Sequence, residues 1–228
     1  MPVLGELGLG RGSIGHVHEV CGVSLRPVVM GVGRQRVAEK LEGLLEEHRP
    51  NVVVLVGVSG GLSEQVKCGD ILIGAKISGP HGDARHMAVT KSYAKDLEGL
   101  ANVHVDGHLH VSDVLVSTPA QKMFTHQQTQ ADAVDMESFY VAELAAAKET
   151  ECVVLRAISD EVGHTLLPAS LGWIKPNGAP RLGKVLMYLA GHPHHLPHLM
   201  QMGRSFKCAT RSLGKATVVL LESIGEQK

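Results

Sequence analysis

The stretch from Val52 to Leu62 (VVVLVGVSGGL) decides the fold. Its first seven residues form a continuous aliphatic run, which is typical of a strand buried on both faces within a parallel sheet. We therefore expect this strand at the centre of the sheet. Residues 36–47 carry a valine and several leucines at helical spacing, with charged residues between them, and Pro50 closes this predicted amphipathic helix.

Strand and helix patterns alternate on both sides of this stretch. Residues 28–31 (VVMG) read as a strand, which together with the helix predicts a βαβ unit with a right-handed crossover. Further strands are predicted over residues 70–77, 103–111 and 152–158, and helices are predicted from near Gln121 and over residues 136–148. Such alternation predicts an α/β fold with helices on both sheet faces and ligands at the carboxyl ends of strands.

The chain changes character after the last predicted strand. Prolines punctuate it, and Asn177-Gly178, just after Pro176, marks a turn. Two terminal helices are still predicted, over residues 182–190 and 199–224. We therefore expect one domain over residues 1–228, with a core of about 16–165 and a helical appendage of about 166–228.

Composition excludes several classes of protein. The 228 residues are 44% hydrophobic and 20% charged, and 22 Lys plus Arg against 23 Asp plus Glu give a net charge of -1. A basic footprint for nucleic acid is absent, and 3% aromatic residues offer little for base stacking. No apolar run approaches the roughly 18 residues that span a bilayer, and residues 1–15 lack a signal-peptide pattern. A cytoplasmic protein without nucleic-acid or membrane-inserted partners is expected.

Weak motifs are set aside. The dinucleotide-type pattern Gly10-x-Gly12-x-x-Gly15 does not link a strand to a helix. Histidines cluster between two prolines without an acidic partner, so a solvated segment is favoured over a metal site, and no metal is predicted: His192, His194, His195 and His198. The scattered cysteines read as reduced packing residues: Cys21, Cys68, Cys152 and Cys208.

Two glycine loops follow predicted strands. Ser59-Gly60-Gly61 comes directly after the aliphatic run and offers free backbone N–H groups that can cradle a phosphate or a ribose. A tight strand exit that needs glycine is the structural alternative. Gly31 and Gly33 repeat the arrangement after the neighbouring strand, and Arg34 adds a cation. Two such loops favour an anionic or polyol ligand.

Carboxylates stand near the same predicted edge. Asp160, beside Ser159, ends the strand over residues 152–158, although either residue could instead cap a helix. Asp135 fits a helix-capping role. Glu137 could converge with Asp160 on one site, one acid hydrogen-bonding hydroxyls and the other protonating a leaving group.

Four segments in sequence resemble the purine nucleoside phosphorylase and methylthioadenosine nucleosidase superfamily. They are V-G-V-S-G-G-L, G-D-I-L-I, A-V-D-M-E-S and V-L-R-A-I-S-D, and their order and spacing agree over residues 28–163. The resemblance implies a single three-layer αβα domain with a mixed, partly barrel-like central sheet. It also implies an enzyme that cleaves a ribosyl N-glycosidic bond by phosphorolysis or hydrolysis.

The region after residue 160 resembles a narrower branch. Residues 160–171 (DEVGHTLLPASL), the turn at Pro176 and the Gly191-His192-Pro193 segment look like hopanoid-associated nucleosidases or phosphorylases, which act on adenosylhopane. This likeness implies a lipid-linked substrate. Methylthioadenosine, adenosylhomocysteine or a general purine nucleoside is the alternative.

The resemblance implies roles for individual residues. Glu137 matches the glutamate that hydrogen-bonds ribose hydroxyls, and Met136 matches the methionine on the ribose face. Asp160, with Ser159 beside it, matches the aspartate that donates a proton to N7 of adenine, so we expect burial to keep it protonated near neutral pH. Other positions are expected to bind substrate: Leu115 and Val116 the adenine edge, and Gly31, Gly33, Arg34, Ser59, Gly60 and Gly61 the sugar or phosphate.

The chain departs from the family pattern at its start. Relatives begin with an apolar strand and a G-M-x-x-E loop whose glutamate activates water, whereas residues 1–15 offer Glu6 without a preceding strand. We therefore expect the first strand to be missing and the activating group to be in doubt.

Two readings of function, from different classes, follow. The leading one is an adenosine-type nucleosidase or phosphorylase without a cofactor, in which phosphate is a potential co-substrate. Another class is a nucleoside-binding homologue with impaired catalysis. The family also implies a homo-oligomer, with a dimer preferred, around a small-molecule nucleoside.

Overall fold

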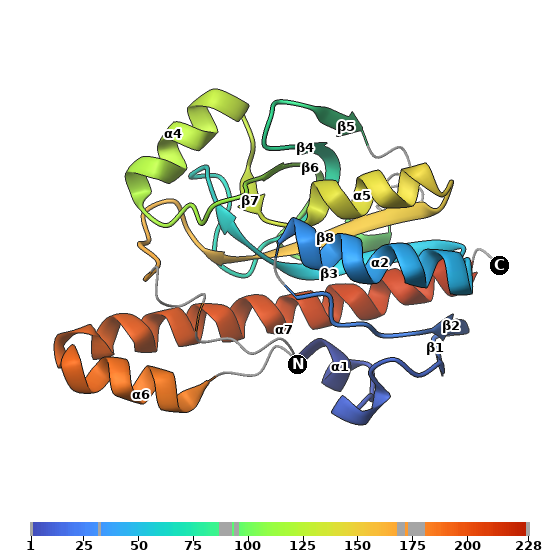
Figure 1. Cartoon of the computed structure of the whole chain (residues 1–228), viewed down its shortest axis with the longest axis horizontal. Coiled ribbons are helices and arrows are strands. Elements are labelled where there is room, and N and C mark those ends of the chain that lie inside the picture. The colour runs from blue at the N-terminus through green and yellow to red at the C-terminus, as the bar shows by residue number, and fades with distance from the viewer. Residues whose placement is uncertain are drawn as a thin grey trace.

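The protein folds into three layers, as seen in a computed structural model that describes residues 2–31, 33–86, 93, 96–167, 172 and 181–226. A mixed sheet lies between two helical layers (Figure 1). Helices α2 (Arg34–His48) and α5 (Ser138–Ala147) cover one face, and α7 (Leu196–Glu226) covers the other. The predicted α/β class with a mixed central sheet is confirmed.

Six strands form the main sheet, in the order β5-β4-β6-β7-β3-β8. Because β8 pairs with both β3 and β4, and β7 pairs with both β6 and β3, five of these strands close into a ring. This ring is the partly barrel-like sheet expected from the resemblance. The strands are β3 (Val52–Gly61), β4 (Ile71–Ser78), β5 (Ala84–His86), β6 (Val103–Val111), β7 (Ala133–Asp135) and β8 (Glu151–Asp160).

The prediction that the aliphatic run lies fully buried at the sheet centre is wrong in one respect. Strand β3 pairs with β8 along its length, but with β7 only at Gly60 and Gly61. Residues 52–58 are therefore only half-buried. The strand predicted over residues 28–31 does not form, since the part of it that the structure describes is irregular, so the predicted βαβ unit is also wrong. The ring thus closes at the glycine end of β3 and stays open along its valines.

A small N-terminal subassembly lies outside the ring, against α7 (Figure 1). It consists of α1 (Pro2–Glu6), a 3-10 turn at Arg11–Ser13, and an antiparallel hairpin of β1 (His18–Val20) and β2 (Val23–Leu25). Within the described residues, no strand of the main sheet precedes α2. This agrees with the expectation that a first strand is missing from the sheet.

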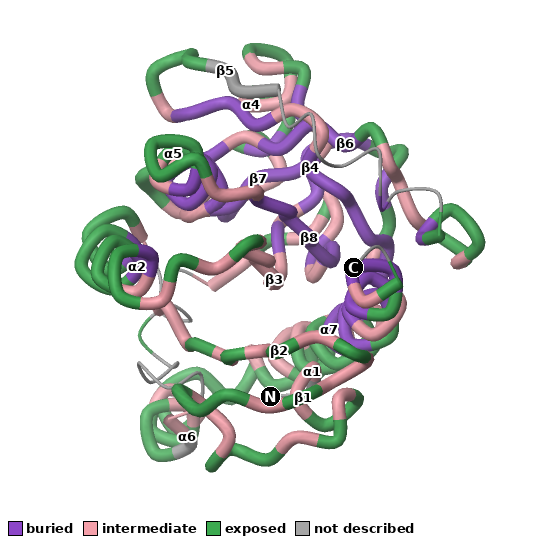
Figure 2. The backbone as a smooth tube through the Cα atoms, turned by 90° about the vertical axis from the view of Figure 1, so that its right-hand side faces the viewer, coloured by how far each residue is buried: buried purple, intermediate pink, exposed green. Residues whose placement is uncertain are grey.

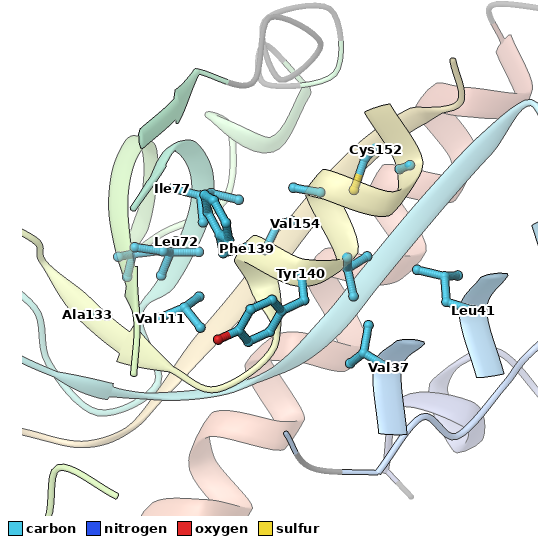
Figure 3. Packing of buried hydrophobic residues seen from close by; sticks show 14 of the residues in the cluster. Val37, Leu41, Leu72, Ile77, Val111, Ala133, Phe139, Tyr140, Cys152 and Val154 are labelled. Carbon is cyan, nitrogen blue, oxygen red and sulfur yellow. The ribbon is translucent and has the colours of Figure 1, made fainter. Parts of the chain in front are cut away.

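The core between the sheet and α2 and α5 fixes the position of α5. Figure 3 shows Phe139 and Tyr140 of α5 directed among apolar side chains of the sheet, while Val37 and Leu41 of α2 pack nearby. Phe139 and Tyr140 are 6% and 5% exposed, so rotation of α5 would bring large rings into water. Residue 137, at the start of α5, is thereby held in place.

Helix α7 divides into two halves. Its C-terminal half buries Ala209, Leu213 and Leu220 against the sheet, whereas its first half is exposed or half-buried (Figure 2). Helix α6 (Leu182–Gly191) and a 3-10 turn (Pro193–His195) lead into that first half. The predicted terminal helices are confirmed, and half of α7 forms part of the core.

The predicted turn at Pro176-Asn177-Gly178 lies outside the described residues. Helix α4 (Pro119–Thr129) begins at a capping box in which Thr118 and Gln121 satisfy each other's backbone N–H groups. In the part of the chain that the structure describes, no helix has the length and apolarity to cross a membrane.

Two glycines of α7 make a matched test of this packing. A Cβ atom built on Gly225 would lie 2.2 Å from the carbonyl oxygen of Cys21, whereas one built on Gly203 would meet nothing within 4 Å. We expect Gly225→Ala to lower the free energy of unfolding by about 1–3 kcal/mol because the N-terminal hairpin must move. Gly203→Ala should raise it by about 0.5–1 kcal/mol through helix propensity. Urea unfolding followed by circular dichroism measures both; equal effects would contradict this packing.

Candidate active site

The carboxyl ends of β3 and β8 and the end of β7 meet at one edge of the ring. Gly60 of β3 pairs with Val134 on one side and with Asp160 on the other. Three residues after Val134 comes Glu137, the N-cap of α5. The sheet register therefore brings both predicted catalytic acids to the closed end of the ring, on either side of the end of β3, residues 59–61.

A buried arginine joins the acids at the start of α5. Arg156 of β8 is 4% exposed; its Nε lies 2.6 Å from Asp135 Oδ2, and its Nη2 lies 3.3 Å from Glu137 Oε2. Asp135 also accepts hydrogen bonds from the backbone N–H groups of Glu137 and Ser138. Asp135 thus serves as a helix cap and ion-pair partner, and the structural reading of this residue holds.

Gly57 makes room for this arginine. A Cβ atom at Gly57 would lie 1.9 Å from Arg156 Nη1, so a side chain there would push the guanidinium away from its carboxylates. Burial raises the pKa of the Glu137 carboxyl above its ordinary value, while the Arg156 charge acts in the opposite direction. The Arg156–Glu137 contact thus opposes the effect of burial on this acid.

The loop before α2 contributes a backbone donor. The Gly33 N–H donates to Glu137 Oε1 at 2.9 Å, and Gly33 has a φ of 93°, a conformation that favours glycine. Arg34 is exposed, and its guanidinium lies 5.4 Å above the ring of Tyr140. The neighbouring Gly31 is closely approached by Arg36. The predicted Gly31–Arg34 loop therefore reaches Glu137 through Gly33.

Asp160 sits in a different environment. It is 5% exposed; its Oδ1 accepts from Ser159 Oγ at 2.7 Å, and its Oδ2 accepts from the ammonium of Lys122 on α4. Lys122 is fully buried, and it also donates to the carbonyl oxygens of Glu161 and His164. All three ammonium protons therefore have acceptors.

Lys122 and Asp160 form a buried ion pair. Leaving either partner alone at this depth would be costly, so the two side chains are buried together. The expectation that burial keeps Asp160 protonated stays a prediction.

Ser59, Gly60 and Gly61 are the last residues of β3, so the prediction that they form a loop after the strand is wrong. This end of β3 lies directly against Asp160. A Cβ atom at Gly60 would lie 3.1 Å from Asp160 Oδ2. The Ser59 carbonyl oxygen lies 3.2 Å from Ser159 Oγ and is an alternative acceptor for its single proton. The Ser59 hydroxyl is buried and has no hydrogen-bond partner among the described residues, which leaves a donor and acceptor for a ligand.

The remaining predicted residues flank this edge. Met136 is half-buried between Asp135 and Glu137. Val116 packs against the cluster of Leu62, Ala131 and Val134, next to the end of β3, and Leu115 is half-buried beside it. The structure thus places the predicted residues around one edge, with Arg34 at its periphery.

Two residues of the site were not singled out from the sequence. Arg156 carries a signal, because a charge inside the buried run 152–158 requires a buried partner. Lys122 carries none, since a lysine in a helix usually faces water. Only the docking of α4 beside the end of β8 shows its role.

Comparison with known proteins agrees with this geometry. The family model described as the phosphorylase superfamily matches residues 9–190. The chain belongs to the phosphorylase superfamily. A 5'-methylthioadenosine/S-adenosylhomocysteine nucleosidase of Haemophilus ducreyi is 27% identical over 169 residues, covering 64% of this chain and 70% of that protein. A Bacillus licheniformis protein of the same name is 26% identical over 155 residues, covering 58% and 66%.

Solved structures of this superfamily share the fold. A Colwellia psychrerythraea methylthioadenosine/adenosylhomocysteine nucleosidase in complex with adenine gives a TM-score of 0.70 at 17% identity, covering 96% of this chain and 91% of that one. Futalosine hydrolase of Helicobacter pylori gives 0.63 at 16% identity, covering 100% and 93%. The predicted superfamily is confirmed; the narrower hopanoid branch is not shown.

Arg156 should stabilise the two buried carboxylates of Asp135 and Glu137. We expect Arg156→Met to lower the free energy of unfolding by about 3–5 kcal/mol at pH 7, because two buried carboxylates lose their cation. Because the pKa of Glu137 is raised in the folded protein, protonation of this carboxyl stabilises the fold. That stabilisation is fully present below the ordinary pKa of 4.5 and is lost as the pH rises through the pKa of the folded state. The loss should therefore be smaller near pH 5 than at pH 7.

The control is Lys148→Met, which removes an exposed partner of Glu46. Guanidinium titrations at both pH values should show no measurable change for this variant. An equal loss of unfolding free energy at both pH values for Arg156→Met would contradict this explanation.

Proposed function

We propose that this protein hydrolyses the N-glycosidic bond of a 5'-substituted adenosine of the methylthioadenosine or adenosylhomocysteine type, releasing adenine. Membership of the phosphorylase superfamily and the names of its relatives support this reaction. The observation that carries the proposal is the pairing of buried Asp160 with Lys122 and Ser159 at the edge that also holds Glu137.

Glu137 suits a ribose anchor. Its two oxygens accept from the Gly33 N–H and from Arg156, and each retains capacity for another donor. Two adjacent ribose hydroxyls can supply those donors. The unpartnered Ser59 hydroxyl offers a further polar contact.

Asp160 acts with Lys122 as the acid. When the bond between C1' and N9 breaks, its electron pair moves to adenine, which becomes a better leaving group once N7 is protonated. Asp160 takes a proton from Lys122 and passes it to N7, which leaves Lys122 as a neutral amine. Water adds its hydroxide to C1', and its remaining proton restores the pair. The buried setting of Asp160 and Lys122 favours this transfer because the groups are already positioned.

The substrate and the nucleophile of the proposed reaction can each be tested by comparing two candidates directly. Adenosylhopane, implied by the resemblance of the C-terminal region, is a second candidate substrate. Phosphate in place of water would give a sugar 1-phosphate. We favour water because the curated relatives are nucleosidases.

A binding protein without turnover is the second candidate function, and one observation favours it. Two glutamates precede the predicted Gly31–Arg34 loop. Glu6 lies against Gly214 of α7, and Glu19 is exposed on β1. Among the described residues neither forms a hydrogen bond or ion pair with the site, so neither matches the water-activating glutamate that the resemblance implies. Binding of adenine nucleosides without adenine release would establish this alternative.

Adenine release tests the proposal. Methylthioadenosine, adenosylhomocysteine, adenosylhopane and adenosine are each incubated with the protein, with and without phosphate, and free adenine is measured by chromatography. Release from the first two without phosphate is expected. Asp160→Asn should lower kcat about 10²–10⁴-fold while leaving the affinity for the nucleoside nearly unchanged.

The matched control is Asp106→Asn, an exposed aspartate on β6, which should keep the full rate. Absence of release from every nucleoside by the folded protein would overturn the enzyme proposal.

Lys122 is tested by the dependence of kcat on pH. Without the ammonium, Asp160 must take its proton from solvent, so Lys122→Met should retain activity within about ten-fold near pH 6, where protons are more abundant. It should lose at least about 100-fold more near pH 8.5, because nothing resupplies the proton. Lys215→Met, on the exposed face of α7, serves as control. A loss that is equal at all pH values would show that Lys122 has only a structural role.

A further inference from the structure

The C-terminal third of the chain has an unusual charge distribution. Residues 162–221 contain no Asp or Glu, yet they hold seven of the 22 Lys and Arg residues. The rest of the chain then carries 15 basic against 23 acidic residues, so the near-zero net charge conceals a strong separation of charge. A segment of one sign indicates a partner of the opposite sign.

Four of these seven basic residues lie on a helical hairpin that projects from the core: Lys184, Arg204, Lys207 and Arg211. Helix α6 runs beside the first half of α7, away from the sheet (Figure 1). The turn between them is ordered by Tyr188, whose ring stacks on His192 at 4.5 Å and whose hydroxyl lies 2.7 Å from His195 Nδ1. The hairpin, residues 182–211, is thus a preformed and accessible element.

Apolar side chains gather on the same hairpin. It holds five of the ten large apolar side chains that are exposed in the described part of the chain, with exposures of 45–73%: Leu186, Met187, Leu196, Met200 and Phe206. Such a concentration is unusual for a surface without a partner.

Apolar and basic residues share one exposed stripe of α7. Its members succeed one another at spacings of three or four residues, which places them on one helix face, and all are exposed: Leu196, Met200, Arg204, Lys207 and Arg211. The apolar members stand at the hairpin tip and the basic members follow. Leu186 and Met187 of α6 add apolar area, and Lys184 adds charge.

We propose that the α6–α7 hairpin docks this protein onto a membrane surface that carries anionic lipid headgroups. Leucine and methionine side chains enter the boundary between headgroups and acyl chains, and the arginines and lysines bind phosphates. Long basic side chains reach the headgroup layer while their stems contact apolar surface. No described helix could cross the bilayer, so the association is peripheral.

Other partners fit these features less well. Nucleic acid would match the charge but would leave the leucines and methionines uncovered, and the hairpin has few rings for base stacking. A second copy docked hairpin to hairpin would bring two acid-free, basic surfaces together, which like charges oppose. An anionic lipid surface accommodates both the charge and the apolar side chains.

Sedimentation with vesicles tests the proposal on the full chain. Vesicles of phosphatidylcholine with 30 mol% phosphatidylglycerol are compared with pure phosphatidylcholine at about 0.1 M and 0.5 M salt. We expect a partition coefficient at least about ten-fold higher on the anionic vesicles at low salt. High salt should reduce it.

Two variants and a charge-matched control locate the surface. Arg204→Glu with Lys207→Glu, and separately Leu186→Ser with Met187→Ser, should each lower partitioning at least about five-fold. Lys40→Glu with Arg49→Glu makes the same charge change on α2 and its C-cap, on the other face of the sheet, and should leave partitioning nearly unchanged.

Three results would overturn the proposal. They are no binding to anionic vesicles, an equal loss in the α2 control, and a self-associated state in light scattering that Leu186→Ser with Met187→Ser dissolves. The measurement uses no nucleoside, so it is independent of the proposed reaction.

Discussion

The buried guanidinium of Arg156 is the interaction on which the site depends. It lies inside the ring, against a glycine that leaves room for it, and joins Asp135 and Glu137 at the start of α5. A cation at 4% exposure is tolerated only with partners in place, so β8, β3 and α5 must assemble in one arrangement. The apolar packing of Phe139 and Tyr140 against the sheet fixes α5 in the same position.

Local pattern predicted most of the fold. The strands over residues 103–111 and 152–158, and the helix before β3, follow from aliphatic runs and helical spacing, and the structure has them within one or two residues. The burial of β3 did not follow, because burial depends on which strand lies beside it. The run 52–58 has the composition of a central strand but lacks a partner on one edge up to Gly60. Residues 28–31 likewise have strand composition without a strand neighbour.

The site, like the fold, could be predicted from the sequence only in part. Glu137 and Asp160 could be placed on one sheet edge because chain order and strand ends fix where such residues lie. Their hydrogen-bond partners could not be predicted, since those partners are distant in sequence. Gly33 reaches Glu137 across 104 positions, and Lys122 reaches Asp160 across 38.

The two acids therefore differ chiefly in the cation that each one faces. Arginine keeps its proton in proteins, so Arg156 can fix Glu137 and lower its pKa but cannot pass a proton to it. Lysine can release a proton when it is buried, so Lys122 can convert Asp160 from an acceptor into a donor as charge develops on a leaving group. In the proposed reaction, the choice of cation would assign binding to one carboxylate and acid chemistry to the other. Exchanging arginine and lysine between the two positions would exchange those capacities, although both pairs would keep the same net charge.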